Sequence, residues 1–187
     1  MPNSIDRTIN ALGDLGKAAA IVLVALAALI AAPPPAKADD DGGIRLVTQN
    51  MFVGTSFAPL TTAQSPLEFA LAVATIYNNI LASKPAERMA AMAREIAQKR
   101  PDLVALQEVL ILRTGTGGLP ATTVRSDFLQ SLLDELAALG QRYSAVAILP
   151  GLDAQAPSAL GFDVRISIQD AILVRSDQLG GAIKVSN

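Results

Sequence analysis

The stretch "RPDLVALQEV", residues 100–109, constrains the fold of this chain more than any other part of the sequence. It is apolar without interruption from Leu103 to Leu106, which predicts a strand that is covered on both faces. The strand then stops at Gln107 and Glu108. Two interpretations of this end are open: Glu108 marks the return of the chain to water, or it is a rigidly mounted metal ligand or acid–base group.

Two helices are predicted between an earlier strand and this one. The earlier strand, residues 43–50, is rich in β-branched residues and ends on two amides. Ser65 followed by proline predicts the start of a helix over residues 67–82. A second helix begins at Pro85 and ends before Pro101. Its spacing places Met89, Met92 and Ile96 on the inner side, opposite Arg88, Glu95 and Lys99.

The rest of the chain is predicted to turn from α/β to mostly β structure. Residues 113–123 are expected to form a loop, and Ser126 is expected to cap a third helix. The resulting element order, β-α-α-β-α-β-β-β, predicts an α/β domain. The last strands are expected at residues 142–150, on either side of Gln169 and Asp170, and at residues 180–187.

The chain has no cysteine and no histidine among its 187 residues. The absence of cysteine excludes disulfides, thiolate zinc sites, cysteine nucleophiles and a lipid anchor on cysteine. The absence of histidine excludes any mechanism in which this chain alone supplies an imidazole base or ligand. A hydrophobic share of 51% with 17% charged residues is typical of a folded domain rather than of a disordered chain.

Residues 1–38 have the pattern of a cleaved secretory signal peptide. Arg7 and Lys17 precede an apolar run, residues 18–32, and Ala36-Lys37-Ala38 has the A-x-A pattern of a cleavage site. The run is shorter than the roughly 20 apolar residues that a membrane span needs, so no stable span is expected. An uncleaved membrane anchor and a buried core helix are the alternatives.

Cleavage near Ala38 would leave residues 39–187 as a secreted or periplasmic domain. Its net charge would be −3, because the removed part carries three basic and two acidic residues of a chain with net charge −2. Such a domain has no general attraction for nucleic acid. The sequence indicates no protein partner.

Polar side chains are expected at the ends of two strands, Asn50 after the first and Glu108 after the second. If the strands are parallel neighbours, both side chains lie at one rim of the sheet. A carboxylate there can ligate Mg²⁺, which prefers oxygen ligands and retains several waters. An amide beside it can orient a phosphate oxygen or a water. Taken alone, a Glu and an Asn at strand ends are more often ordinary solvent-facing residues.

Two segments resemble motifs of the endonuclease/exonuclease/phosphatase family. "IRLVTQN", residues 44–50, resembles the opening strand of that family, and "IAQKRPDLVALQEV", residues 96–109, is similar to its Pro-Asp…Leu-Gln-Glu segment. The later segments "DFLQSLLDEL", "RYSAV" and "DAILVRSD" look like the next family elements. The resemblance therefore covers Ile44 to Asp177.

The resemblance implies a four-layer α/β/β/α sandwich that hydrolyses phosphate esters or phosphodiesters with Mg²⁺ or Mn²⁺. Residues 39–187 would be the N-terminal part of such a domain and would lack most of the second sheet. Glu108 would be the metal ligand, and Asn50 would act in catalysis by contacting metal-bound water or phosphate. The substrate would be a nucleic acid, a phospholipid headgroup or an inositol phosphate, among which the sequence does not distinguish.

Two later motifs of the family are absent from the chain. These are the Gly-Asp-x-Asn turn, which orients the attacking water, and the terminal Ser-Asp-His. No general base is identified, since Asp163 and Asp170 are expected to be turn or edge residues. Two further interpretations stay open: a truncated or degenerate non-catalytic remnant that acts at most as a binding or structural domain, and an unrelated small α/β binding protein of the periplasm.

We expect the exported protein to begin at Asp39, because the small residues of the A-x-A site precede it. N-terminal sequencing of protein recovered outside the cytoplasm checks this expectation. Retention of Met1 on membrane-bound protein would contradict it and favour an uncleaved anchor.

Overall fold

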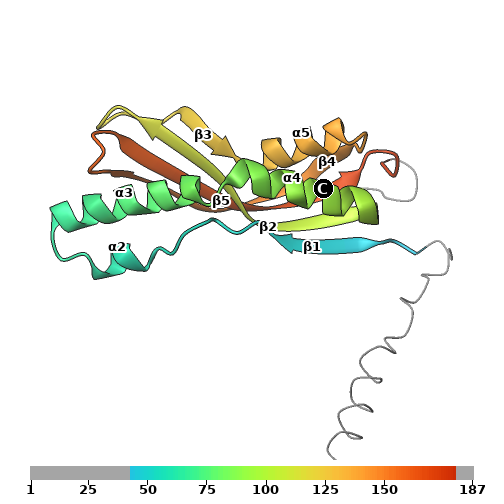
Figure 1. Ribbon diagram of the computed structural model, residues 1–187, viewed down its shortest axis with the longest axis horizontal. Coiled ribbons are helices and arrows are strands. Elements are labelled where there is room, and N and C mark those ends of the chain that lie inside the picture. Colours follow the sequence, from blue (N-terminus) through green and yellow to red (C-terminus); the bar gives the residue numbers. More distant parts are fainter. Residues whose placement is uncertain (1–42, 180–187) are drawn as a thin grey trace, which may run out of the picture. The chain divides into compact units, whose positions relative to one another are not determined.

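The computed structural model describes residues 43–179, and those from Ile44 onward belong to one compact unit (Figure 1). The predicted α/β class is confirmed, because a five-stranded sheet is combined with helices. In chain order the elements are β1 (Leu46–Asn50), α2 (Ala58–Thr62), α3 (Pro66–Ala82), α4 (Pro85–Lys99), β2 (Leu103–Gly115), β3 (Thr123–Asp127), α5 (Phe128–Ala138), β4 (Tyr143–Pro157) and β5 (Asp163–Arg175).

The sheet is mixed, with the strand order β1-β2-β5-β4 and with β3 paired to β2. β1 and β2 are parallel neighbours, and Asn50 lies opposite Gln107 in their register. β5 runs antiparallel to both β2 and β4, and β3 runs antiparallel to β2. The parallel pair therefore brings the two segments predicted to carry polar ends side by side.

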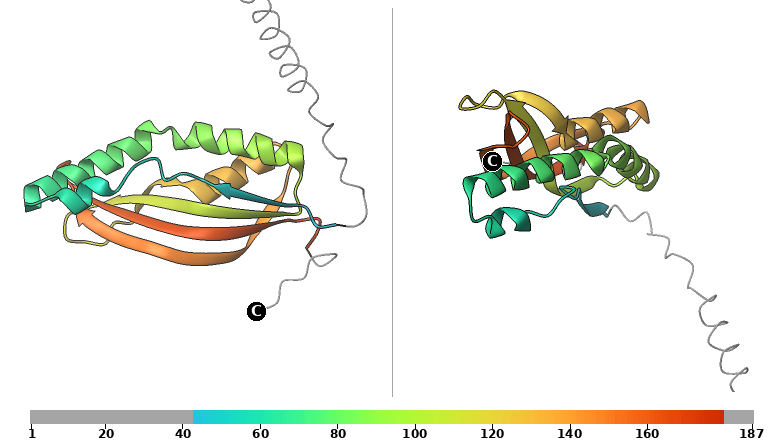
Figure 2. Two further views of the ribbon diagram at one scale, coloured as in Figure 1. Left: turned by 90° about the horizontal axis from the view of Figure 1, so that it is seen from below. Right: turned by 60° about the vertical axis from the view of Figure 1, so that its left-hand side comes forward.

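Helices α3, α4 and α5 lie on one face of the sheet, and the core lies between them and the strands (Figure 2). The predicted inner side of α4 is confirmed, because Met89, Met92 and Ile96 are buried. Apolar residues on the helix-facing side of the strands pack against this side of α4. The fully buried side chains include Ile76, Ile80, Met89, Ile96, Leu106, Leu110, Leu132, Leu136 and Leu173.

The opposite face of the sheet is open within residues 43–179. Leu46, Leu149 and Ile172 expose 62%, 69% and 43% of their surface. The sequence predicts a second strand covered on both faces, but Ala105 is only half-buried because no other layer of the described chain lies over it. The second sheet of the expected sandwich is not among the described residues.

The strand that contains Glu108 does not end there, contrary to the sequence prediction. β2 continues to Gly115, because its second half pairs with β3 on one side and with β5 on the other. The loop predicted over residues 113–123 is correspondingly shorter, and Thr123 already belongs to β3.

Residues 163–175 form one strand rather than the two that the sequence predicts. The buried apolar residues of its first half, Val164 and Ile166, occupy even-numbered positions, whereas Ala171 and Leu173 in its second half occupy odd-numbered ones. This change of phase accompanies a register shift against β2. Pairing with β2 and β4 keeps the strand continuous across this register shift. In the sequence alone, the change in the positions of the apolar residues looks like the end of one strand and the start of another.

The helix starts agree with the sequence prediction in one case and differ by one residue in another. Ser65 caps α3, since its side chain accepts a hydrogen bond from the backbone N–H of Glu68. Asp127 rather than Ser126 caps α5, and its carboxylate accepts from the Gln130 N–H at 3.0 Å. Ser and Asp are both favoured caps, so two adjacent candidates are not separated by sequence. The short helix α2 lies where a loop was predicted.

A buried ion pair joins Asp102 and Arg175 at the start of β2. Asp102 Oδ1 lies 2.9 Å from the Arg175 guanidinium, and the two residues expose only 8% and 7% of their surface. Asp102 Oδ2 also accepts from the Arg45 backbone N–H at 2.8 Å. Arg175 donates further to the Arg100 carbonyl and the Asp177 carboxylate. The pair therefore connects the beginnings of β1 and β2 to the end of β5.

No helix within residues 43–179 has the length and apolar character needed to cross a membrane. The predicted signal peptide, residues 1–38, and the strand predicted over residues 180–187 lie outside the described residues.

We expect Arg175→Met to lower the free energy of unfolding by about 3 to 5 kcal/mol, because the Asp102 carboxylate would stay buried with only the more distant, exposed Arg45 side chain as counter-charge. Urea denaturation followed by circular dichroism measures the change. Glu87→Gln is the matched control: Glu87 pairs with Lys84 at 2.9 Å, but both side chains are mostly exposed, so its loss should cost no more than about 1 kcal/mol. Equal effects of the two substitutions would contradict the assignment.

Candidate functional site

The side chains of Asn50 and Glu108 are in direct contact, and we call this place the Asn50–Glu108 corner. Asn50 Nδ2 donates a hydrogen bond to Glu108 Oε1 at 2.8 Å. Asn50 is the last residue of β1 and lies opposite Gln107, so regular alternation would project Glu108 from the other face of the sheet. A bulge in β2 instead brings Glu108 to the side of the sheet where Asn50 lies. The register against β5 shifts between Leu106 and Val109, and Glu108 has a φ of 57°.

The Glu108 carboxylate organises the backbone that follows β1. Its Oε2 accepts a hydrogen bond from the Val53 N–H at 2.9 Å, while Oε1 accepts from Asn50. Asn50 Oδ1 in turn accepts from the Phe52 N–H at 2.7 Å. Residues 50–53 are therefore wrapped around one carboxylate, which gives Glu108 a structural role that the sequence analysis does not predict.

Arg88 binds the same segment from the helix side. Its Nη1 donates to the carbonyls of Met51 at 2.5 Å and Phe52 at 2.8 Å, and its Nε donates to the Ser83 carbonyl at 3.0 Å. The guanidinium also lies over the rings of Phe52 and Phe128, at 5.3 and 5.2 Å. Partial burial lowers the pKa of Arg88 from its usual value.

Helix periodicity places Arg88 on the outer side of α4, and in this respect the sequence prediction is wrong. The long side chain turns back past Ser83 toward the loop, which a periodic pattern does not encode. No sequence motif marks Arg88 as part of the corner.

The loop after β1 adopts backbone conformations that side chains disfavour. Phe52 has a φ of 58°, and Gly54 has a φ of 98°. A Cβ on Gly54 would lie 2.4 Å from Ser83 Oγ. That hydroxyl is fixed by hydrogen bonds to the Ile80 carbonyl and Arg88. The loop can therefore approach α3 closely only because residue 54 is a glycine.

The corner offers one carboxylate to a cation. Within residues 43–179, no group of three or more His, Cys, Asp or Glu side chains is arranged to hold a metal ion. Each oxygen of Glu108 accepts one hydrogen bond and retains a second lone-pair site. Because Glu108 is half-buried and Asn50 is exposed, the donor set fits a hydrated Mg²⁺ or Mn²⁺ held through one carboxylate.

Of the two later acidic residues, Asp163 lies at the far end of β5, whereas Asp170 lies opposite the β2 bulge that contains Glu108. Asp163 is the buried first residue of β5, and its carboxylate accepts from the Gly118 N–H and from Gln155, so it connects the loop between β2 and β3 and strand β4 to β5. Asp170 lies within β5, between β2 and β4, and not at an edge as expected. Its position follows from the continuity of β5.

None of the family models, curated proteins or solved structures compared with this chain matches it. The interpretation of the corner therefore rests on its residues and their geometry.

We expect Gly54→Ala to lower the free energy of unfolding by about 2 to 4 kcal/mol, because it combines a disfavoured φ with a clash against Ser83. Gly118→Ala is the matched control, since Gly118 has a φ of 80° with nothing within 4 Å of the added Cβ. It should cost only about 1 to 2 kcal/mol from the backbone alone. Urea denaturation measures both, and a control as damaging as Gly54→Ala would show that the contact with Ser83 is unimportant.

Proposed function

We propose that this chain is an exported relative of the endonuclease/exonuclease/phosphatase family. The intact domain would hydrolyse phosphate esters or phosphodiesters with Mg²⁺ or Mn²⁺. The observation that supports this best is the contact between Asn50 and Glu108 where the parallel pairing of β1 with β2 ends. These are the two residues that the family motifs single out.

Glu108 would hold the cation, and Asn50 would orient the phosphate beside it. The cation, when bound, would polarise a phosphoryl oxygen toward attack by water. The loop of residues 50–53 is held on both sides: Glu108 accepts from the Val53 N–H, and Arg88 donates to the carbonyls of Met51 and Phe52. The geometry of Asn50 would therefore be set before any ligand arrives.

A second proposal is a non-catalytic binding or structural domain. It is favoured by the composition, because the chain has no histidine, and by the corner itself, which has a single carboxylate. Asp170 is the acidic residue that the register places opposite Glu108 on the neighbouring strand, and the chain has no imidazole to share water activation and protonation of a leaving group with it. A nucleic acid, a phospholipid headgroup and an inositol phosphate remain the proposed substrates of the intact domain.

The proposed location is the periplasm or the exterior of a bacterial cell, after cleavage near Ala38. It is supported by the apolar run with its A-x-A site and by the absence of cysteine.

Mn²⁺ is a suitable probe of the corner, because it shares the oxygen preference of Mg²⁺ and broadens nearby amide signals in NMR spectra. We expect titration of the mature protein, residues 39–187, with Mn²⁺ to broaden the backbone amide signals of Asn50, Val53 and Val109 first. Glu108→Gln should weaken this effect at least about tenfold, since it removes the charge of the carboxylate proposed as the metal ligand. Glu95→Gln, which removes an exposed acidic group paired with Lys99 on α4, is the matched control and should leave the titration unchanged.

The same samples should leave a generic phosphodiester uncleaved with added Mg²⁺ or Mn²⁺. Turnover that Glu108→Gln abolishes and Glu95→Gln spares would decide against the non-catalytic proposal. Broadening of amide signals outside the corner, or broadening that persists in Glu108→Gln, would contradict the proposal that Glu108 is the metal ligand.

A further inference from the structure

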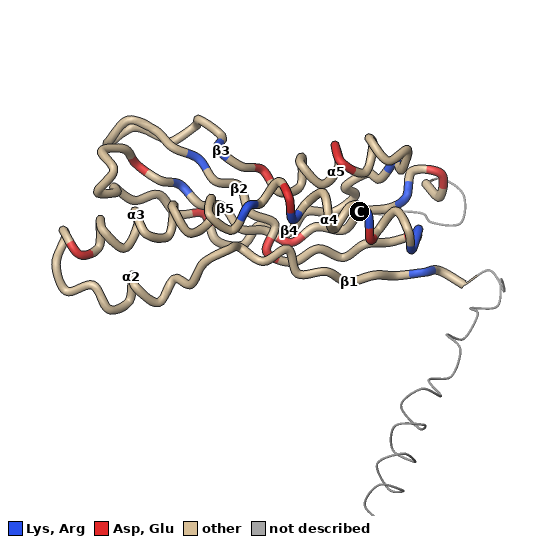
Figure 3. The backbone as a smooth tube through the Cα atoms, viewed as in Figure 1, with Lys and Arg blue, Asp and Glu red and all other residues tan. Residues whose placement is uncertain are grey.

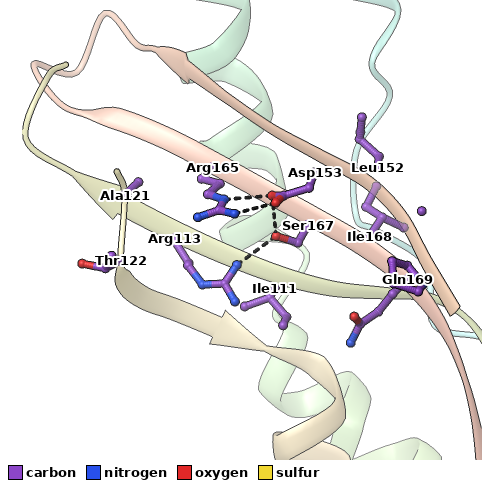
Figure 4. Close-up of a pocket in the computed structure, with 12 residues that line it drawn as sticks. Ile111, Arg113, Ala121, Thr122, Leu152, Asp153, Arg165, Ser167, Ile168 and Gln169 are labelled. Carbon is purple, nitrogen blue, oxygen red and sulfur yellow. Dashed lines mark hydrogen bonds and ion pairs between the residues drawn. The ribbon is translucent and has the colours of Figure 1, made fainter. Parts of the chain in front are cut away.

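A second polar site lies on the open face of the sheet, farther along β2 than the Asn50–Glu108 corner. It is a cavity of 340 Å³ formed between β2, β4 and β5, and none of the corner residues lines it (Figure 4). Its charged residues are Arg113, Asp153 and Arg165, and its uncharged polar residues include Ser167. Ligand pockets of drug-sized molecules begin at about 300 Å³, so the cavity has room for a small organic molecule.

Two arginines face each other across β2 and β5 in this cavity, because Arg113 and Arg165 are direct register partners. Like charges in this arrangement destabilise a sheet unless they are compensated. Basic and acidic residues are otherwise interspersed along the described backbone (Figure 3). The pair is therefore a local feature that needs a local explanation.

One carboxylate compensates only one of the two arginines. Asp153 accepts hydrogen bonds from Arg165 Nε at 2.8 Å and Nη2 at 2.5 Å, which occupies the fork of that guanidinium. The Ser167 hydroxyl donates to Asp153 at 2.8 Å. The Arg165 and Ser167 hydrogen bonds lower the pKa of Asp153 to about 2, so the carboxylate is charged at neutral pH. With Arg113 included, the cavity keeps one net positive charge.

Arg113 is oriented and has donors to spare. Its Nη1 donates to Ser167 Oγ at 2.8 Å, and this is the one side-chain hydrogen bond it makes within residues 43–179. A guanidinium has five N–H donors. The chain of contacts from Arg165 through Asp153 and Ser167 therefore fixes Arg113 at the cavity wall with most of its donors unused (Figure 4).

A bulge in β4 supplies the apolar wall. The register of β4 against β5 shifts between Pro150 and Asp153. A Cβ on Gly151 would lie 2.9 Å from the Ile168 carbonyl, so the bulge depends on a glycine. Leu152, Ile111 and Ile168 line the cavity beside the arginines. Bulges commonly shape a strand next to a binding site.

We propose that this cavity binds a small organic monoanion whose paired oxygens accept hydrogen bonds from Arg113. A phosphodiester and a carboxylate share this chemistry, and both fit the fork of a guanidinium. The ligand's single charge neutralises the excess of the cavity, and its apolar part lies against Ile111 and Leu152. The site is independent of the proposed hydrolytic function, because no metal ion and no residue of the corner takes part.

The test is an NMR titration of the mature protein in EDTA with diethyl phosphate, butyrate and neutral triethyl phosphate. We expect the two anions to shift the Arg113 side-chain signal and the amides of Ser167 and Leu152, and the neutral ester to cause no shift. The comparison of the two anions identifies which oxygen geometry the fork prefers.

Arg113→Gln should weaken anion binding about tenfold or more, as is typical for a hydrogen bond to a charged group. Arg94→Gln is the matched control, because it removes the same charge from the exposed side of α4. Arg113→Lys keeps the charge but lacks the fork, so it should bind more weakly than the wild type and more tightly than Arg113→Gln. Glu108→Gln should bind as the wild type does, which separates this site from the corner.

The melting temperature serves as the check on folding. Without ligand, Arg113→Gln should melt no lower than the wild type, because it relieves the repulsion with Arg165. Added diethyl phosphate should raise the melting temperature of the wild type but not of this variant. Absence of anion binding to the wild type, equal binding by wild type and Arg113→Gln, or equal binding of triethyl phosphate would overturn the proposal.

Discussion

The buried pair of Asp102 and Arg175 sets the register on which the rest of the sheet depends. Asp102 is bonded through its backbone N–H to Arg45 and through its carbonyl to the Arg175 N–H, while the side chains make the ion pair. The alignment of β1 with β2 and of β2 with β5 is thus fixed at one end. A slip of one residue would turn every side chain of a strand to the other face, and it would bury the charges of this pair without partners. The Pro-Asp step before β2 has a clear structural reason.

The bulge at Glu108 is the counterpart of this anchor at the other end of the parallel pair. Regular alternation from Asp102 onward would place the carboxylate on the helix face, where it would be desolvated against the core. The positive φ at Glu108 has a conformational cost, and its two accepted hydrogen bonds offset that cost. The regular pairing of β1 with β2 fixes their register, and the bulge at Glu108 then brings its side chain into contact with that of Asn50.

The sequence predicts best those features that depend on local periodicity. The buried stripe of α4 and the Ser65 cap follow from spacing and from standard capping chemistry, whereas the parallel pairing of β1 with β2 entered the sequence analysis only as a condition, which the structure meets. The unpredicted features all depend on register or on long side chains. The continuity of β5 through its change of phase and the β4 bulge require knowledge of neighbouring strands. Arg88 lies on the predicted helix, but its guanidinium reaches a loop that periodicity does not describe.

The loop of residues 51–53 lies between Arg88 and Glu108 and is hydrogen-bonded to both. The carbonyls of Met51 and Phe52 accept from the Arg88 cation and the Val53 N–H donates to the Glu108 anion, so the loop is held between opposite charges. Anything that draws electron density from Glu108 weakens its hold on the Val53 N–H and shifts the loop toward the Arg88 side. By reciprocity, a loop pulled away from Glu108 leaves that carboxylate more available to a cation. If Glu108 binds a cation as proposed, the free energy of ion binding and the free energy of local loop opening would be coupled through the two oxygen atoms of this carboxylate.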